Sequence, residues 1–100
     1  MAAGADWAKA PGFYLILTDS PGAKSWPIAG ATFILIPKQP KDPAAANEAL
    51  KFFAWAYKNG DAMAGSLDYI PMPDSVVDLI AARWKSEIKD ASGKPVFAMK

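Results

Sequence analysis

The sequence of 100 residues contains no cysteine and no histidine. The absence of cysteine excludes disulfides, thiolate zinc sites, iron–sulfur clusters and cysteine nucleophiles. The absence of histidine excludes imidazole bases and serine triads of the usual kind, and it removes the commonest transition-metal ligand. Any chemistry would have to use carboxylates, amines, hydroxyls and backbone amides. We therefore expect no enzyme activity, no cofactor and no metal site.

The chain also lacks an excess of charge and a long apolar run. Its 11 Lys and Arg residues face 10 Asp and Glu, a formal net charge of +1, which gives no electrostatic reason to expect binding to nucleic acid. The longest nearly apolar run, residues 28–36, is far shorter than the roughly 20 residues that span a membrane. The first six residues carry no basic region of the kind that opens a secretory signal.

What the chain does contain is typical of a small globular domain. Hydrophobic residues make up 52% of it and charged residues 21%, a balance too apolar and too evenly charged for intrinsic disorder. A length of 100 residues allows one domain at most.

Two short runs have the composition of β-strands. Residues 13–17 are aromatic and branched, and a turn at residues 19–22 (Asp-Ser-Pro-Gly) ends them. Residues 32–36 (Thr-Phe-Ile-Leu-Ile) are continuously apolar rather than alternating. This pattern predicts a strand buried on both faces, as in the centre of an α/β sheet.

Two amphipathic helices are predicted after these runs. The first covers residues 44–58, with Asp42 as N-cap, Pro43 at the first helical position and Gly60 as a left-handed C-terminal residue. One or two helical turns follow at residues 61–67. The second long helix covers residues 74–88, and Arg83 and Glu87 within it have the four-residue spacing of an ion pair.

Several features have residue types that carry chemistry elsewhere, and each has a simpler explanation. Asp74 and Asp78 are spaced like an acid–base couple, but helix polarity explains them. Residues 19–22 read as an ordinary turn, and residues 92–94 (Ser-Gly-Lys) as a helix terminator rather than a phosphate nest. The aromatic cluster has the spacing of a helix core: Phe52, Phe53, Trp55 and Tyr57. The sequence by itself therefore predicts no catalytic, ligand-binding or metal-binding residue.

A series of short segments between residues 2 and 97 occurs in the same order in one protein family. They are Gly4-Ala5-Asp6-Trp7, Pro11-Gly12-Phe13-Tyr14, Ser25-Trp26-Pro27-Ile28, Thr32-Phe33-Ile34-Leu35-Ile36, Leu50-Lys51-Phe52-Phe53, Trp55-Ala56-Tyr57, Leu67-Asp68-Tyr69, Pro73-Asp74-Ser75-Val76-Val77, Trp84 and Gly93-Lys94-Pro95. Each segment alone is a weak signal, but their collinear order is a strong one. The chain resembles the periplasmic phosphate-binding proteins of the phosphate-specific ABC transporter, the PstS type.

The resemblance implies that the chain is the C-terminal third of a longer α/β protein with the two-lobed type II periplasmic binding protein fold. Residues 1–30 would cross between the lobes, and residues 31–100 would be the C-terminal part of the first lobe. One or two strands and two long amphipathic helices would complete that lobe. The parent would capture inorganic phosphate in the periplasm and deliver it to the permease subunits of an ABC transporter.

The resemblance also implies that this segment is structural. The family holds phosphate with hydroxyls, helix N-terminal amides, an arginine and an aspartate, an arrangement suited to an oxyanion. Its Gly-Ser-Gly-Thr type loop is absent here, and the single arginine, Arg83, lies in the middle of a helix among different neighbours. We expect no phosphate ligand in these residues, and we expect the isolated chain to fold poorly and to bind no phosphate.

Two other functions remain open from the residues alone. A stand-alone α+β protein-interaction module would use the apolar faces around Phe53 and Trp84 to bind a partner. A small hydrolase using Asp and Ser is the weaker alternative, because no nucleophile has a base beside it in a recognisable motif.

Overall fold

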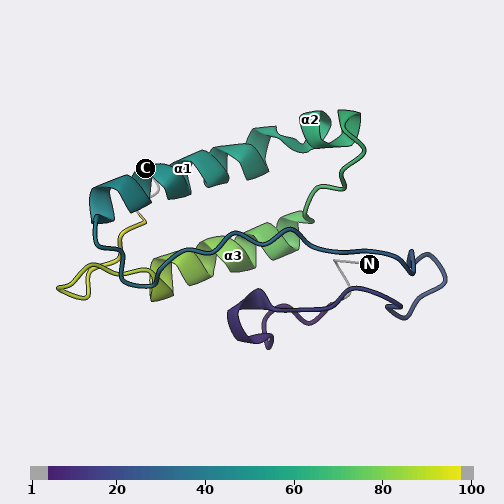
Figure 1. The fold of residues 1–100 in the computed structure, drawn as a ribbon, viewed down its shortest axis with the longest axis horizontal. Coiled ribbons are helices and arrows are strands. Elements are labelled where there is room, and N and C mark those ends of the chain that lie inside the picture. Colours follow the sequence, from purple (N-terminus) through teal and green to yellow (C-terminus); the bar gives the residue numbers. More distant parts are fainter. Residues whose placement is uncertain (1–4, 98–100) are drawn as a thin grey trace.

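The computed structural model describes residues 5–97, and within them the regular elements are helical. They follow in the order η2 (Pro11–Phe13), α1 (Pro43–Asn59), α2 (Asp61–Ser66) and α3 (Asp74–Glu87). In Figure 1, α1 and α3 lie side by side and run in opposite directions, with α2 following α1 at its far end. The extended chain that precedes α1 runs along α3.

Local signals set the helix boundaries, and the predicted helices are confirmed. The Asp42 side chain accepts a hydrogen bond from the Ala45 amide at 3.0 Å, and Pro43 occupies the first turn, so α1 begins where the cap predicts. Helix α3 begins after Pro73, with Asp74 in its first turn. The predicted short helix at 61–67 is α2.

Gly60, between α1 and α2, differs from the prediction. We expected a left-handed residue, but Gly60 has φ −90° and ψ −9°, an ordinary right-handed conformation. A Cβ at this position would lie 2.5 Å from the carbonyl oxygen of Ala56. Glycine is needed here because the backbone passes close to α1, and α2 starts at the next residue.

The predicted α/β fold with one or two strands is wrong for this chain. Residues 5–97 contain no strand, and their β-type pairing is limited to an isolated bridge between Lys89 and Pro95. Residues 28–36 make no backbone hydrogen bond to another described residue. A strand exists only where a neighbouring extended segment exchanges N–H and C=O groups with it. The apolar run has the composition of a strand, but helices α1 and α3 pack beside it instead.

The prediction of a run buried on both faces is also wrong. Ile36 packs against the core, whereas Ile34 is 55% exposed and Leu35 is 93% exposed. Residues 13–17 likewise form no strand: the chain turns tightly at Gly12 and Phe13, which both have φ near 60°. The sequence therefore predicted the helices better than the extended segments.

The buried hydrophobic residues other than Ala10 form two separate clusters. The first contains Leu50 of α1 with Ile88, Val96 and Phe97, which lie after α3. The second brings Trp7 and Leu17 of the N-terminal segment onto Val76 of α3. Helix α3 thus lies between the two clusters, one near each of its ends.

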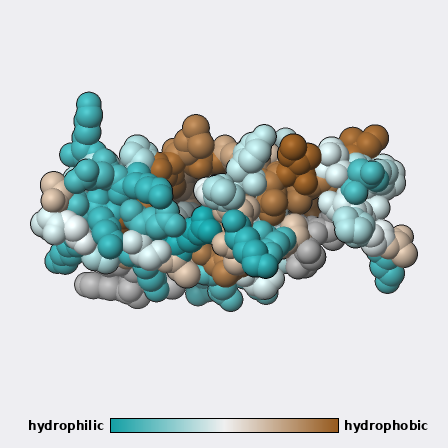
Figure 2. All heavy atoms as spheres, turned by 90° about the horizontal axis from the view of Figure 1, so that it is seen from below, coloured by the Kyte–Doolittle hydropathy of each residue, from teal (hydrophilic) through white to brown (hydrophobic). Residues whose placement is uncertain are grey.

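The molecule is extended for its length. Its radius of gyration is 14.9 Å and its dimensions are 47 × 29 × 19 Å, against about 13 Å for the radius of gyration of a compact 100-residue domain. Figure 2 shows apolar patches open to the surface along one face, with a hydrophilic region at one end. None of the helices within residues 5–97 has the length and apolar character that a membrane crossing requires.

The predicted division of the chain at residues 30 and 31 is not tested by this architecture and stays a prediction. The two predicted segments include residues 1–4 and 98–100, which lie outside the described residues. The same applies to Gly4 of the first family-like segment.

Candidate functional site

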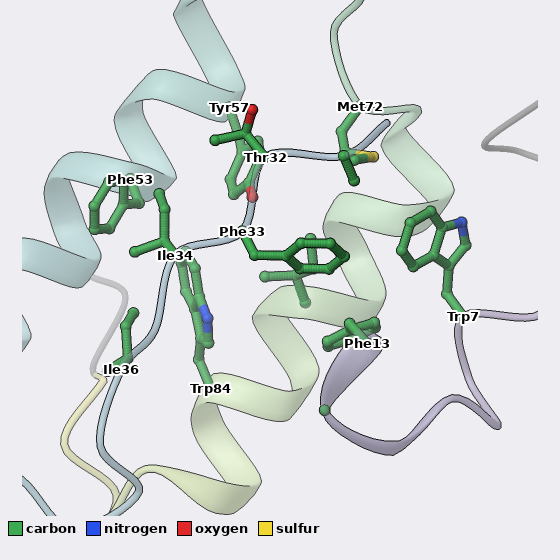
Figure 3. A pocket seen from close by; sticks show the side chains of 13 residues that line it. Trp7, Phe13, Thr32, Phe33, Ile34, Ile36, Phe53, Tyr57, Met72 and Trp84 are labelled. Atoms are coloured by element: carbon green, nitrogen blue, oxygen red, sulfur yellow. The ribbon is translucent and has the colours of Figure 1, made fainter. Parts of the chain in front are cut away.

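An apolar cavity of about 130 Å³ lies where the N-terminal segment, residues 31–36, α1 and α3 meet. Figure 3 shows aromatic side chains directed toward it from each of these segments: Trp7, Phe13, Phe33, Tyr57 and Trp84. Small-molecule sites usually occupy about 300–1,000 Å³ and add a few convergent polar groups. This cavity is smaller and is lined mainly by apolar side chains, so it has the character of incomplete core packing.

A second hollow of about 260 Å³ lies between α1 and α3, on the other side of Tyr57 and Trp84. Its floor is apolar, and Lys58, Asp74 and Asp78 line its edge. Burial raises the pKa of the Tyr57 hydroxyl. Asp74 and Asp78, whose four-residue spacing resembles that of an acid–base couple, both line this edge of the hollow. Neither carboxylate forms an ion pair with a Lys or Arg side chain among residues 5–97.

The helix N-termini are unfavourable places for an anion. The Asp42 carboxylate caps α1, Asp61 lies in the first turn of α2, and Asp74 lies in the first turn of α3. A helix N-terminus attracts anions through its free N–H groups and its positive dipole end. Here an aspartate already supplies the negative charge at each one, and it would repel a bound phosphate.

The turn at residues 92–94 is filled by a carboxylate of the chain itself. One oxygen of Asp90 accepts hydrogen bonds from the Ser92 hydroxyl at 2.6 Å, the Ser92 amide at 2.8 Å and the Lys94 amide at 3.0 Å. The Ser92 hydroxyl, and next the Lys94 amide, lower the pKa of Asp90. The carboxylate occupies the position that a phosphate oxygen would need, so the turn is structural.

The hydroxyl groups of the turn at residues 19–22 and its surroundings are also used locally. Ser20 donates to the Leu17 carbonyl at 2.9 Å, and Ser25 donates to the Pro21 carbonyl at 3.1 Å. Positive φ values at Asp19 (52°) and Gly22 (130°) let the chain reverse direction here. These residues make a turn, as the sequence predicted.

Arg83 is committed to contacts within the chain. Its guanidinium donates to the carbonyls of Ala8 at 2.9 Å and Ala10 at 3.4 Å, and it lies 4.5 Å from the ring centroid of Phe13. The predicted pair with Glu87 is present, with 3.8 Å between Arg83 Nε and Glu87 Oε1. No local pattern in the sequence indicates the contacts with residues 8–13, because these residues are 70 or more positions away from Arg83.

Glu87 extends this network to the segment before α1. Lys38 Nζ lies 2.8 Å from Glu87 Oε2, and the Lys89 amide donates to the Lys38 carbonyl at 2.9 Å. The hydrogen bond and charge of Lys38 lower the pKa of Glu87. Arg83 and Glu87 of α3 therefore connect three segments that are distant in sequence.

No group of three or more acidic residues within residues 5–97 is arranged to hold a metal ion. The side chains of Arg83, Glu87 and Asp90 make hydrogen bonds or ion pairs inside the chain and line neither cavity. These side chains hold segments of the chain together, as we expect of a structural segment. The absence of a phosphate ligand from these residues stays a prediction.

Comparison with known proteins first defines a class: the relatives are named as binding proteins. The chain is 42% identical over 96 residues to a protein of Pasteurella multocida, 44% identical over 88 residues to one of Xylella fastidiosa, and 43% identical over 88 residues to one of Haemophilus influenzae. Each of these proteins is named phosphate-binding protein PstS. No family model matches the chain.

The resemblance predicted from the motifs is therefore confirmed, and it concerns a segment of those proteins. The matched region takes up 96% of this chain but 28% of the Pasteurella protein. For the Xylella and Haemophilus proteins it takes up 88% of this chain and 24% and 26% of the relative. The chain spans about a quarter of the length of the curated relatives that it matches.

Proposed function

We propose that this chain is the C-terminal part of a substrate-binding protein that captures inorganic phosphate in the periplasm and delivers it to the permease subunits of an ABC transporter. The similarity to proteins named PstS over 96% of the chain carries this proposal. It leaves little of the chain for a separate interaction module. Within the parent, these residues are a structural segment rather than the phosphate site.

The local chemistry supports the structural role. An aspartate stands at the start of each of the helices α1, α2 and α3, and Arg83 is held by Ala8, Ala10 and Glu87. Asp90 fills the turn at residues 92–94. An oxyanion that entered any of these places would meet a negative charge or displace a bond that already exists.

Two calorimetric titrations with inorganic phosphate test the proposal. The isolated chain is expected to release no heat of binding, because none of its residues is expected to contact phosphate. A chimera of the Pasteurella multocida protein, in which this chain replaces the 96 matched residues, is expected to bind phosphate with an affinity close to that of the unaltered Pasteurella protein. Micromolar binding by the isolated chain would overturn the structural role, and a folded chimera without phosphate binding would overturn the assignment.

A further inference from the structure

The hollow of about 260 Å³ between α1 and α3, which we call the interhelical hollow, is bordered by three aromatic rings. The ring centroids of Tyr57 and Trp84 are 6.2 Å apart, and those of Trp84 and Phe97 are 5.3 Å apart with the rings nearly perpendicular. Phe97 is only 3% exposed, and burial raises the pKa of the Tyr57 hydroxyl. The rings therefore form a poorly hydrated floor that continues from one helix to the other.

Small side chains keep the interhelical hollow open above this floor. Ala54 lines it from α1, and Val77 and Ala81 line it from α3. Its volume of about 260 Å³ exceeds the roughly 150 Å³ of a protein cavity that binds benzene. It approaches the roughly 300 Å³ at which small-molecule sites begin. A ligand of about one aromatic ring with a short substituent therefore fits.

The edge of the interhelical hollow carries an excess of negative charge. Asp74 and Asp78 line it one turn apart on α3, and Lys58 lines it from α1. No ion pair joins these three side chains to one another or to another charged side chain among residues 5–97. Two carboxylates and one ammonium leave a net charge of −1 at the edge, which a ligand with a single positive charge would neutralise.

This combination of floor and edge favours one class of ligand, an organic cation with an apolar body. An apolar body gains free energy by leaving water for the floor, and the negative faces of aromatic rings attract a cation. A metal ion fits poorly, because Ca²⁺ takes six to eight oxygen ligands and no metal-binding group of acidic residues is found in residues 5–97. An anion would meet the two carboxylates.

We propose that the interhelical hollow is a binding site for a small organic cation, an ammonium group carried on an apolar body of about one aromatic ring. The ammonium group lies at the edge beside Asp74 and Asp78, and the apolar body packs on Trp84. The inference goes beyond the proposed function and does not depend on it, because every residue that it uses lies in this chain.

Fluorine NMR of the 100-residue chain labelled with 5-fluorotryptophan tests the proposal. The chain has four tryptophans: Trp84 lines the hollow, whereas Trp55 is 53% exposed and lines neither cavity. Trp84→Phe and Trp55→Phe assign their signals. The probe is benzylammonium, and benzyl alcohol is the uncharged control of the same size.

Benzylammonium should move the Trp84 signal along a saturating curve and leave the Trp55 signal in place. It should bind at least about fivefold more tightly than benzyl alcohol, because the alcohol lacks the attraction to the carboxylates and rings. Equal affinity for the two probes would overturn the inference. A parallel response of both tryptophans would do the same, since it would show unspecific adsorption.

A pair of aspartate variants tests the edge. Asp74→Asn removes a carboxylate that lines the hollow, and Asp61→Asn is the matched control, in the first turn of a helix but outside the hollow. Asp74→Asn should weaken benzylammonium binding about two- to threefold and leave benzyl alcohol unaffected. Asp61→Asn should change neither affinity. Equal affinity for benzylammonium in the two variants would contradict the role of the edge.

A pair of alanine variants tests the floor. Ala81→Leu fills part of the hollow, and Ala82→Leu, an exposed neighbour on α3 that lines neither cavity, is the matched control. Ala81→Leu should abolish the saturating response of Trp84, while Ala82→Leu should keep it. Helical circular dichroism checks that both variants retain α3. Unchanged binding by Ala81→Leu would overturn the inference.

The same titration of the Pasteurella chimera shows whether the site is present in the parent. The Trp84 signal should respond as it does in the isolated chain, and loss of that response would overturn the inference. Calorimetric titration with phosphate is a separate measurement on the same chimera. A response to benzylammonium without phosphate binding would support the site and contradict the proposed function.

Discussion

Arg83 has a structural role that could not be inferred from its residue type. An arginine in a relative of phosphate-binding proteins suggests an anion ligand, since its planar group matches an oxyanion. Here the guanidinium faces the Ala8 and Ala10 carbonyls and the ring of Phe13. It fixes the N-terminal segment on α3, a structural function that only the folded chain reveals.

Replacing Arg83 should loosen that attachment. Arg83→Met keeps much of the apolar stem but removes two hydrogen bonds and the contact with Phe13, so it should lower the free energy of unfolding by about 1–3 kcal/mol. Chemical denaturation followed by tryptophan fluorescence measures the loss, and Lys85→Met, an exposed residue on the same helix, is the control. Equal stability of the two variants would contradict the role of Arg83.

The pair of Lys38 and Glu87 gives a prediction in pH. Lys38 holds the pKa of Glu87 below its ordinary value of 4.5, so Lys38→Met should raise the pKa of Glu87 toward that value. Because the folded pKa is the lower one, the pair stabilises the fold above about pH 4.5, and this contribution is lost as the pH falls through the folded pKa. A carboxyl NMR titration measures the shift. Lys41→Met should leave the titration of Glu87 unchanged.

At the scale of elements, the helices were predictable and the extended segments were not. Asp42, Pro43 and Asp74 act on groups one to three residues away, so the sequence alone specifies where α1 and α3 begin. A strand depends on a partner that can lie anywhere in the chain. Residues 32–36 have the composition of a strand, but no described segment pairs with them, and the predicted sheet is absent.

The same contrast holds for the candidate site. The pairing of Arg83 with Glu87 follows from a spacing of four residues and was predicted. The contacts of Arg83 with Phe13 and of Lys38 with Glu87 join residues that are far apart in sequence. No periodicity or local motif encodes them, so they could not be read before the fold was known.

Helix α1 depends most on Leu50, the one fully buried side chain among the described residues. Leu50→Ala should lower the free energy of unfolding by about 2–5 kcal/mol through lost burial and a residual cavity. Helical circular dichroism during thermal unfolding measures the effect. Leu67→Ala, at a site that is 69% exposed, should change little, and a similar loss in both variants would contradict the packing described here.

At the scale of the whole molecule, the chain exposes more surface, 7538 Å², than a compact folded monomer of the same mass would expose. Among the described residues few hydrophobic side chains are buried, and apart from Ala10 they are divided between two clusters. The helices α1 and α3 are regular, yet the extended segment of residues 13–36 leaves apolar side chains in water. Good local structure and incomplete burial are what a segment of a larger protein is expected to show.

Calorimetry should record this incomplete burial directly. Unfolding of a typical 100-residue domain raises the heat capacity by about 1.2–1.5 kcal/mol/K, and the isolated chain should fall clearly below that range because much of its apolar surface is already hydrated. Leu35→Ser, at the 93% exposed position, should leave the heat capacity change unaltered. A value within the ordinary range would show that the isolated chain buries residues 13–36.

The two hydrophobic clusters near the ends of α3 have a consequence for the order of unfolding. They share no buried residue: one gathers around Leu50 and Phe97, the other around Trp7 and Leu17. Each cluster can open without exposing the other, so amide hydrogen exchange should resolve two groups of protons with separate opening free energies. Amides in the middle of α3, next to both groups, should exchange last, which would make this helix the final part of the chain to lose its structure.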